Sequence, residues 1–312
     1  MKLKNRIVLP AMAREKSIDG RPTKELLSYY ENMAKSGFSL IILEHAYVLK
    51  SGKASPNQMA IDEDYDKDIL SEIAKTIKKY DCKAIMQISH AGNKAKIDGD
   101  VFGPSAKENV KELSKEEIKT IVDAFAKAAR RVKEMGFDGV EIHSAHGYLL
   151  NQFYSPLENK REDEYGGSLE NRLRIHKEII GAIRKEIGDF QIFLRLGAAD
   201  YTEGGNTEED GVQATKLLES YGIDAIDISG GVLGFLKHPE VEYGYFSSVS
   251  KKIKDSVKIP VMMTGGVKNL KQCEDLLSRG VCDLVGVGRQ SLKNPSWLLE
   301  YMRKEWFNSL LF

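Results

Sequence analysis

Short apolar runs rich in β-branched residues alternate with amphipathic segments along the whole chain. Eight of these runs predict strands, at Arg6–Leu9, Leu40–Leu43, Lys83–Ser89, Gly139–His143, Gln191–Leu196, Ala225–Ser229, Pro260–Met263 and Asp283–Val287. The segments between them have apolar residues at helical spacing, as in the stripe of Ile118, Ile121, Val122, Phe125 and Ala129. Eight strands that are each followed by a helix predict an α/β fold, a single (β/α)8 TIM barrel over residues 1–312.

Local signals support this prediction. Ser114 and Glu117 have the spacing of a capping box and mark the start of the helix that carries the stripe. A doubly wound open sheet is the alternative fold, but no G-x-G-x-x-G motif follows the first strand. Two connections are unusually long, residues 91–113 and the segment after the fourth strand. Long loops at one end of such a barrel are where function concentrates.

Charge and cysteine content exclude several classes of protein. Lys and Arg together number 46, as do Asp and Glu, and the two signs are interspersed, which argues against binding nucleic acid or a membrane surface. Cys82, Cys273 and Cys282 form no C-x-x-C pair, so neither a zinc ribbon nor a cysteine-ligated iron–sulfur cluster is expected. The absence of a long apolar run and of a signal peptide predicts a cytoplasmic protein.

The fourth predicted strand ends in three side chains that can handle protons. His143 closes the strand, and His146 and Tyr148 follow within five residues. Since apolar Val140 and Ile142 should face the outer helices, strand alternation places His143 inside the barrel, near its carboxyl end.

The same alternation points Gln87 and Arg195 inward. An arginine inside a barrel is costly unless it is paired, so we expect either an ion pair with Glu141 or Asp227, or a polar or anionic ligand.

The two histidines have three open interpretations. They could bind a metal ion with a third ligand from Glu141, His90 or Asp200, as in a metal-dependent hydrolase or lyase. They could instead donate hydrogen bonds to one substrate oxygen while the nearby phenol delivers a proton. In the third interpretation, one histidine has only a structural role and hydrogen-bonds to backbone groups of the loop.

Glycines after the last two strands predict a phosphate site. Gly265 and Gly266 follow the seventh strand, and Gly288 and Arg289 follow the eighth, at the usual phosphate-binding position of this barrel. Glycine lets backbone N–H groups approach phosphate oxygens, and arginine adds a bidentate grip. The Gly230–Gly231 pair after the sixth strand is consistent with the same phosphate site.

The sequence resembles a known family over nearly its whole length. The shared motifs are NRIVLPAM, QISHAG, HSAHGYLLNQF, the run N-x-R-x-D-x-Y-G-G-S-x-x-N-R from Asn159 to Arg172, LRLGAADYTEGG and VGVGRQSLKNP. They are similar to those of the old yellow enzymes, FMN-dependent ene-reductases, and most similar to the short bacterial branch called thermophilic-like. The run from Asn159 is highly specific, whereas the glycine pairs are not.

The resemblance implies a role for each candidate residue. The loop Pro10, Ala11, Met12 and Ala13 should back the flavin edge, with Gln87 at its pyrimidine side and Arg195 near N1 and O2; Gly265, Gly266, Gly288 and Arg289 should hold the FMN phosphate. NADPH or NADH should reduce FMN. In a second, ping-pong half-reaction, hydride should then pass to an alkene whose carbonyl oxygen is bound by His143 and His146 and whose α-carbon Tyr148 protonates.

Departures from the family pattern affect the same region. Ala13 replaces a cysteine, Glu15 a tyrosine, and Asn93 an arginine that are common in this branch, and His45 stands where a small residue usually lies against the flavin. His45 is therefore either a new contact with the flavin or turned away from it.

We expect a small-molecule substrate and a possible homo-oligomer. A barrel that binds flavin without catalysis remains a third functional class, beside the ene-reductase and the metal-dependent enzyme.

Overall fold

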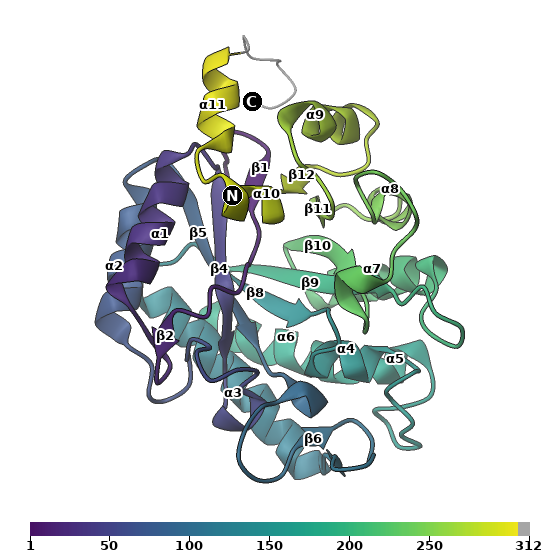
Figure 1. Ribbon diagram of the computed structural model, residues 1–312. Coiled ribbons are helices and arrows are strands. Elements are labelled where there is room, and N and C mark those ends of the chain that lie inside the picture. The colour runs from purple at the N-terminus through teal and green to yellow at the C-terminus, as the bar shows by residue number, and fades with distance from the viewer. Residues whose placement is uncertain (305–312) are drawn as a thin grey trace.

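The computed structural model describes residues 1–304, and among these eight parallel strands close into a barrel (Figure 1). Each strand lies beside the next of the eight in chain order, and the last pairs with the first. The strands are β1 (Ile7–Leu9), β4 (Leu40–Tyr47), β5 (Lys83–Ser89), β8 (Gly139–Ser144), β9 (Gln191–Ala199), β10 (Ala225–Gly230), β11 (Val261–Thr264) and β12 (Leu284–Gly286). The predicted (β/α)8 barrel and all eight predicted strands are confirmed.

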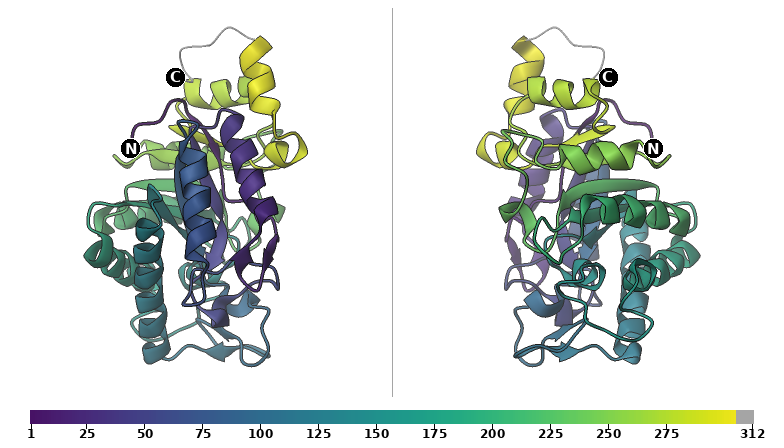
Figure 2. Two further views of the ribbon diagram at one scale, coloured as in Figure 1. Left: turned by 90° about the vertical axis from the view of Figure 1, so that its left-hand side faces the viewer. Right: turned by 90° about the vertical axis from the view of Figure 1, so that its right-hand side faces the viewer.

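Helices surround the barrel, and Figure 2 shows two of them, α1 and α2, side by side on one flank. The outer helices are α1 (Lys24–Lys35), α2 (Lys67–Lys78), α3 (Lys115–Glu134), α6 (Arg174–Ile187), α7 (Glu208–Tyr221), α8 (Ser247–Lys254), α9 (Leu270–Ser278) and α11 (Trp297–Lys304). Shorter helices α4 (Leu149–Tyr154), α5 (Leu169–Arg172) and α10 (Arg289–Lys293) lie in the connections. No helix within residues 1–304 combines the length and apolarity needed to cross a bilayer.

Two apolar layers follow from strand alternation. The inner cluster consists of Val8, Leu40, Ile42, Ile85, Phe193, Ala225, Met262 and Leu284. The outer cluster lies between strands and helices and includes Ile88, Val140, Ile142 and Leu194, as predicted. Two residues beyond inner residues Ile85 and Phe193, the strands present Gln87 and Arg195, so the interior becomes polar toward the carboxyl ends.

Two strands run further than their apolar patterns indicated. Strand β4 continues past Leu43 to Tyr47, and β9 continues past Leu196 to Ala199. Strand β4 contains a bulge, because Leu43 pairs with Met86 whereas Ala46 pairs with Ile88. An extra residue of this kind interrupts the two-residue alternation on which the sequence prediction depended.

The predicted capping box at the start of α3 is present. The Glu117 N–H donates to Ser114 Oγ at 3.2 Å, and the Ser114 N–H donates to Glu117 Oε2 at 2.7 Å. Such a cap stabilises a helix by about 1 kcal/mol. The cap starts α3 directly after the long connection of residues 91–113, which therefore has a defined end.

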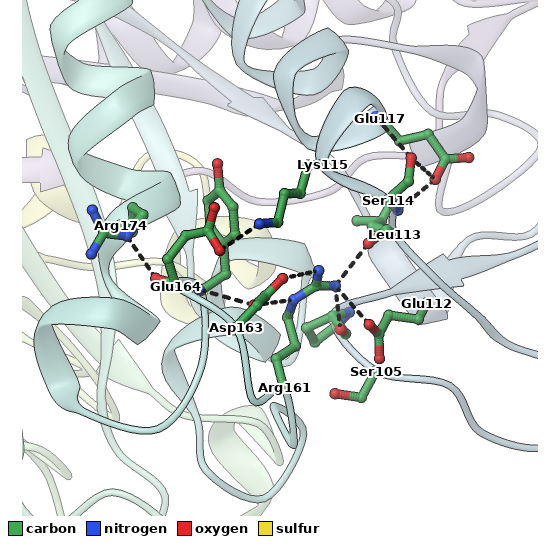
Figure 3. A network of polar contacts seen from close by, with 12 residues as sticks. Ser105, Glu112, Leu113, Ser114, Lys115, Glu117, Arg161, Asp163, Glu164 and Arg174 are labelled. Carbon is green, nitrogen blue, oxygen red and sulfur yellow. Dashed lines mark hydrogen bonds and ion pairs between the residues drawn. The ribbon is translucent and has the colours of Figure 1, made fainter.

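The motif that begins at Asn159 builds a scaffold (Figure 3). Buried Arg161 donates to the carbonyl oxygens of Pro104 and Leu113 at 2.9 and 2.7 Å, and pairs with Asp163 at 2.6 Å. Nearby, Lys115 pairs with Glu164 at 2.7 Å. These contacts tie the connection after β8 to the connection after β5, so this specific motif supports the loops at one end of the barrel.

Candidate active site

A cavity of about 490 Å³ opens at the carboxyl ends of the strands, within the usual size of a cofactor or substrate site. The predicted site residues that line it are Ala11, Met12, Ala13, His45, Gln87, His143, His146, Tyr148, Arg195, Gly265, Gly266, Gly288 and Arg289. Pro10 is buried but does not line the cavity. The fold therefore brings together residues from seven parts of the chain that the sequence separates widely.

His143, His146 and Tyr148 form a compact cluster. The ring centroid of His143 lies 5.2 Å from that of His146 and 5.0 Å from that of Tyr148. His146 adopts φ 58°, an unusual conformation for a residue other than glycine. Two contacts hold this turn: the His146 N–H donates to the Gly230 carbonyl at 3.2 Å, and the Lys94 ammonium donates to the His146 carbonyl at 2.8 Å.

Hydrogen bonds favour one tautomer of His146. Arg195 Nη2 donates to Ser229 Oγ at 3.3 Å, and among residues 1–304 the hydroxyl proton of Ser229 has no acceptor other than His146 Nε2, 2.8 Å away. His146 Nε2 is then an acceptor, and Nδ1 carries the proton. His143 Nδ1 is buried and has no hydrogen-bond partner among the described residues. Burial lowers the pKa of both histidines well below the usual value, so both rings are neutral.

Arg195 combines the two roles that the sequence left open. Its Nε lies 3.2 Å from Asp227 Oδ2, an ion pair inside the barrel. Its Nη1 donates to the Ala11 carbonyl at 3.3 Å, and the guanidinium also lines the cavity. Thr264 Oγ1 donates to Asp227 Oδ1 at 3.0 Å and so helps to hold the carboxylate. One edge of the guanidinium is neutralised by Asp227, while the other reaches the site.

Glu141 lies on the inner face below the histidines. It accepts a hydrogen bond from Gln87 Nε2 at 2.5 Å, and its other oxygen is buried without a partner among the described residues. Burial, and then the nearby carboxylate of Asp227, raise the pKa of Glu141. This environment favours the protonated acid, which is a poor metal ligand.

The other suggested metal ligands are also engaged elsewhere. His90 Nε2 lies 3.2 Å from Ser51 Oγ, and Asp200 Oδ2 accepts a hydrogen bond from Ser155 at 2.7 Å. Within residues 1–304, no group of three or more His, Cys, Asp and Glu side chains is arranged to hold a metal ion. The hydrolase or lyase interpretation of the histidine pair therefore lacks a ligand set in this part of the chain.

Glycines that follow β11 and β12 line one edge of the cavity. A Cβ on Gly286 would lie 2.0 Å from Thr264 Oγ1, and one on Gly288 would lie 2.5 Å from Met12 Sδ. A Cβ on Gly266 would lie 2.5 Å from the ring of Tyr245. Side chains larger than hydrogen therefore cannot be accommodated without movement of these neighbours, and the backbone of this edge stays accessible from the cavity.

Tyr245 is a site residue that the sequence did not reveal. Its ring stacks on His238 with centroids 3.9 Å apart, and the Arg289 guanidinium carbon lies 5.4 Å from its centroid. Tyr245 precedes α8 in a connection without any strand-end pattern, so no local signal points to it. The other unpredicted lining residues are Lys94, Ser229, Val232, Leu233, Gly234, Leu236, Phe246, Thr264, Val267 and Gly286.

Two of these residues lie at or just after strand ends, where the sequence pattern indicates site residues. Ser229 lies two positions after inward Asp227 on β10, and Lys94 follows the QISHAG motif. By contrast, Gly230 and Gly231 do not line the cavity, although Gly230 supports the turn at His146 through its carbonyl. Strand β10 therefore contributes Ser229, rather than the glycine pair, to the cavity lining.

Comparison with known proteins identifies the family. Residues 1–304 match the NADH:flavin oxidoreductase / NADH oxidase family. The NADPH dehydrogenase of Bacillus licheniformis is 39% identical over 303 residues, which cover 95% of this chain and 89% of the relative. The NADPH dehydrogenase of Bacillus subtilis is 36% identical over 305 residues, with coverage of 95% and 89%.

Solved structures agree. An old yellow enzyme homologue from Zymomonas mobilis has a TM-score of 0.86 at 25% identity, and the match covers 99% of this chain and 91% of that one. A 2-naphthoyl-CoA reductase has a TM-score of 0.92 at 27% identity, but this chain spans only 50% of that larger one. The barrel, its cavity and these matches lead to one conclusion: the chain belongs to the NADH:flavin oxidoreductase / NADH oxidase family, that of the old yellow enzymes.

Proposed function

We propose that this protein reduces the C=C bond of α,β-unsaturated carbonyl compounds. Its family makes it an FMN-dependent NAD(P)H oxidoreductase that acts on small molecules. The observation that carries the narrower proposal is the cluster of two neutral histidines and a protonated tyrosine that lines the same cavity as Arg195.

The residues of the cavity fit FMN. The Arg195 guanidinium is buried and only partly neutralised, and suits the flavin edge where negative charge gathers on reduction. Ala11, Met12 and Ala13 offer a wall of small or flexible side chains beside it. The glycine edge with Arg289 suits the phosphate. When bound, FMN supplies reversible hydride transfer, which none of the side chains can perform.

His143 and His146 would bind and polarise the carbonyl oxygen of the acceptor. Hydride addition to the β-carbon moves negative charge onto that oxygen, and preorganised N–H donors stabilise this charge more than they stabilise the ground state. Neutral imidazoles can do this without losing a proton, and Ser229 leaves Nδ1 of His146 free to donate. No hydrogen bond within residues 1–304 engages the ring of His143, which lines the cavity.

Tyr148 would deliver the proton to the α-carbon. Burial, and then the charge of Glu15, raise the pKa of Tyr148 to about 12, so the phenol keeps its proton at neutral pH. A group that is to act as an acid must enter the reaction protonated. The ring of Tyr148 lies edge-on to that of His143, and both line the cavity, so the phenol would lie in the same space as the groups that would orient the substrate.

The sharing of one cavity supports alternating half-reactions. His143, Tyr148 and Arg195 all face the same space of about 490 Å³, much of which FMN would occupy. The reductant NADPH or NADH and the acceptor would then bind in turn. This is the ping-pong order implied by the family resemblance.

The test is a pair of anaerobic mixing experiments on the purified protein. We expect a bound-flavin spectrum, bleaching by NADPH or NADH, and rapid return of the oxidised spectrum when 2-cyclohexen-1-one is added. Colourless protein that takes up no FMN would contradict the assignment. Reduction of the flavin without reoxidation by any enone would favour a barrel that binds flavin without catalysing this reaction. Loss of activity on addition of a chelator would favour the metal-dependent alternative.

A further inference from the structure

The bulge in β4 turns His45 into the cavity. Ile42 belongs to the inner cluster, and Ile41 and Leu43 to the outer one, so uninterrupted alternation would direct His45 outward, toward the helices. Between Leu43 and Ala46 the register against β5 shifts by one residue, and His45 lies in this interval. It lines the cavity instead. Bulges beside active sites commonly redirect a side chain in this way.

Hydrogen bonds fix the proton of His45 on the nitrogen that faces the cavity. The Ala54 N–H donates to Gln58 Oε1 at 2.6 Å, so the other end of this side chain is the amide nitrogen. That nitrogen lies 2.7 Å from His45 Nδ1. An amide nitrogen can only donate, so Nδ1 accepts, and a neutral imidazole must carry its proton on Nε2. Burial, and then Arg195, lower the pKa of His45 to about 4, which keeps the ring neutral at pH 7.

The N–H of His45 lies among the groups proposed to bind the acceptor. The ring centroid of His45 is 5.4 Å from that of Tyr148 and 6.2 Å from that of His143, whose plane it nearly parallels at 22°. Gln58 is buried and lies outside the cavity lining, so Nε2, on the opposite edge of the ring, faces the cavity. No residue within 1–304 hydrogen-bonds to Nε2.

We propose that His45 is a specificity-determining third donor, which binds the second oxygen of acceptors whose activating group carries two, such as a nitro group. This inference rests on the proposed function. A ketone presents one oxygen, which His143 and His146 can satisfy, and leaves His45 without a partner. A nitro group spreads its developing negative charge over two oxygens, so a third N–H adds stabilisation that a ketone cannot use.

The test compares two ligands that differ chiefly in oxygen count, nitrobenzene and benzaldehyde. Binding is measured by calorimetry on oxidised holoenzyme without a reductant, so turnover plays no part. His45→Leu removes the donor at similar size, and His45→Gln retains a donor. We expect His45→Leu to weaken nitrobenzene binding about tenfold, as the loss of one buried hydrogen bond implies, and to change benzaldehyde binding less than twofold. His45→Gln should restore most of the difference.

Controls separate the possible outcomes. The flavin midpoint potential should be the same in His45→Leu and the unmodified protein. A shifted potential with equal loss for both ligands would show that His45 acts on the flavin or on packing, and would overturn the inference, as would unchanged nitrobenzene binding. His143→Ala should weaken benzaldehyde binding. If it does not, the proposed function itself fails, whereas dependence on His143 without selectivity from His45 would overturn this inference alone.

Discussion

Ser229 Oγ lies 2.8 Å from His146 Nε2 and receives a hydrogen bond from Arg195 on its other side. Ser229 thereby links the buried guanidinium of Arg195 to the imidazole of His146. These hydrogen bonds favour the tautomer of His146 that carries its proton on Nδ1, and Ser229 itself lines the cavity. Removing the hydroxyl should therefore affect ligand binding while leaving the backbone unchanged.

We predict that Ser229→Ala weakens the binding of benzaldehyde to the oxidised holoenzyme about fivefold, the worth of one hydrogen bond of about 1 kcal/mol. The reason is that the proton of His146 is then no longer favoured on Nδ1. Ser229→Thr keeps the hydroxyl and serves as the matched control. Calorimetric titration measures both variants, and an affinity unaffected by the alanine would contradict this role of Ser229.

Tyr148→Phe should separate the two half-reactions. Reoxidation of the reduced protein by 2-cyclohexen-1-one should slow about 100-fold, a modest loss for a removed general acid. Reduction by NADPH should stay within twofold, because that step needs no proton from the phenol. Stopped-flow absorbance measures each phase separately. Equal losses in both phases would show that the ring only shapes the cavity.

The buried histidine His176 should make the fold sensitive to acid. Its Nε2 lies 2.8 Å from Ser144 Oγ, and burial lowers the pKa of His176 to about 3. Between about pH 6.5 and 3 the unfolded chain binds a proton that the folded chain does not, so stability is lost as pH falls, by up to about 1.4 kcal/mol per pH unit. Other groups titrate there too, and buried Glu141, whose pKa is raised, acts in the opposite sense.

A variant isolates this contribution. His176→Asn should lower the free energy of unfolding at pH 7.5, yet lose less further stability between pH 6.5 and 4.5 than the unmodified protein. Urea titrations followed by circular dichroism at several pH values give the two slopes. Parallel slopes would mean that His176 does not drive the acid response.

Two glycine substitutions should have opposite effects. Gly286→Ala puts a Cβ 2.0 Å from Thr264 Oγ1, and we expect about 2 kcal/mol of destabilisation together with weaker FMN binding. Gly181→Ala, at an exposed position of helix α6, meets no atom within 4 Å and should stabilise the protein by up to about 1 kcal/mol. Thermal unfolding compares the pair, and FMN fluorescence on release reports the affinity. Neutral behaviour of Gly286→Ala would show that the strand edge can relax.

Much of the architecture could be derived from local pattern. Apolar runs located the eight strands, and alternation correctly assigned Gln87 and Arg195 to the interior. His143, His146 and Tyr148 were found because they follow one strand directly, and strand ends of such a barrel converge. Family resemblance added expected roles for these residues, and those roles await the experiments above.

Other features depend on contacts between distant segments. The most specific motif, around Arg161, supports loops and lies outside the cavity lining, which its residue types did not reveal. Tyr245 reaches the glycine edge from a connection without periodicity. His45 faces the cavity only because β4 and β5 pair with a shifted register. The sequence by itself determined periodicity, and with it the barrel. Register shifts and loop packing arise when strands and loops far apart in the chain meet, so only the tertiary structure decided which side chains share the site.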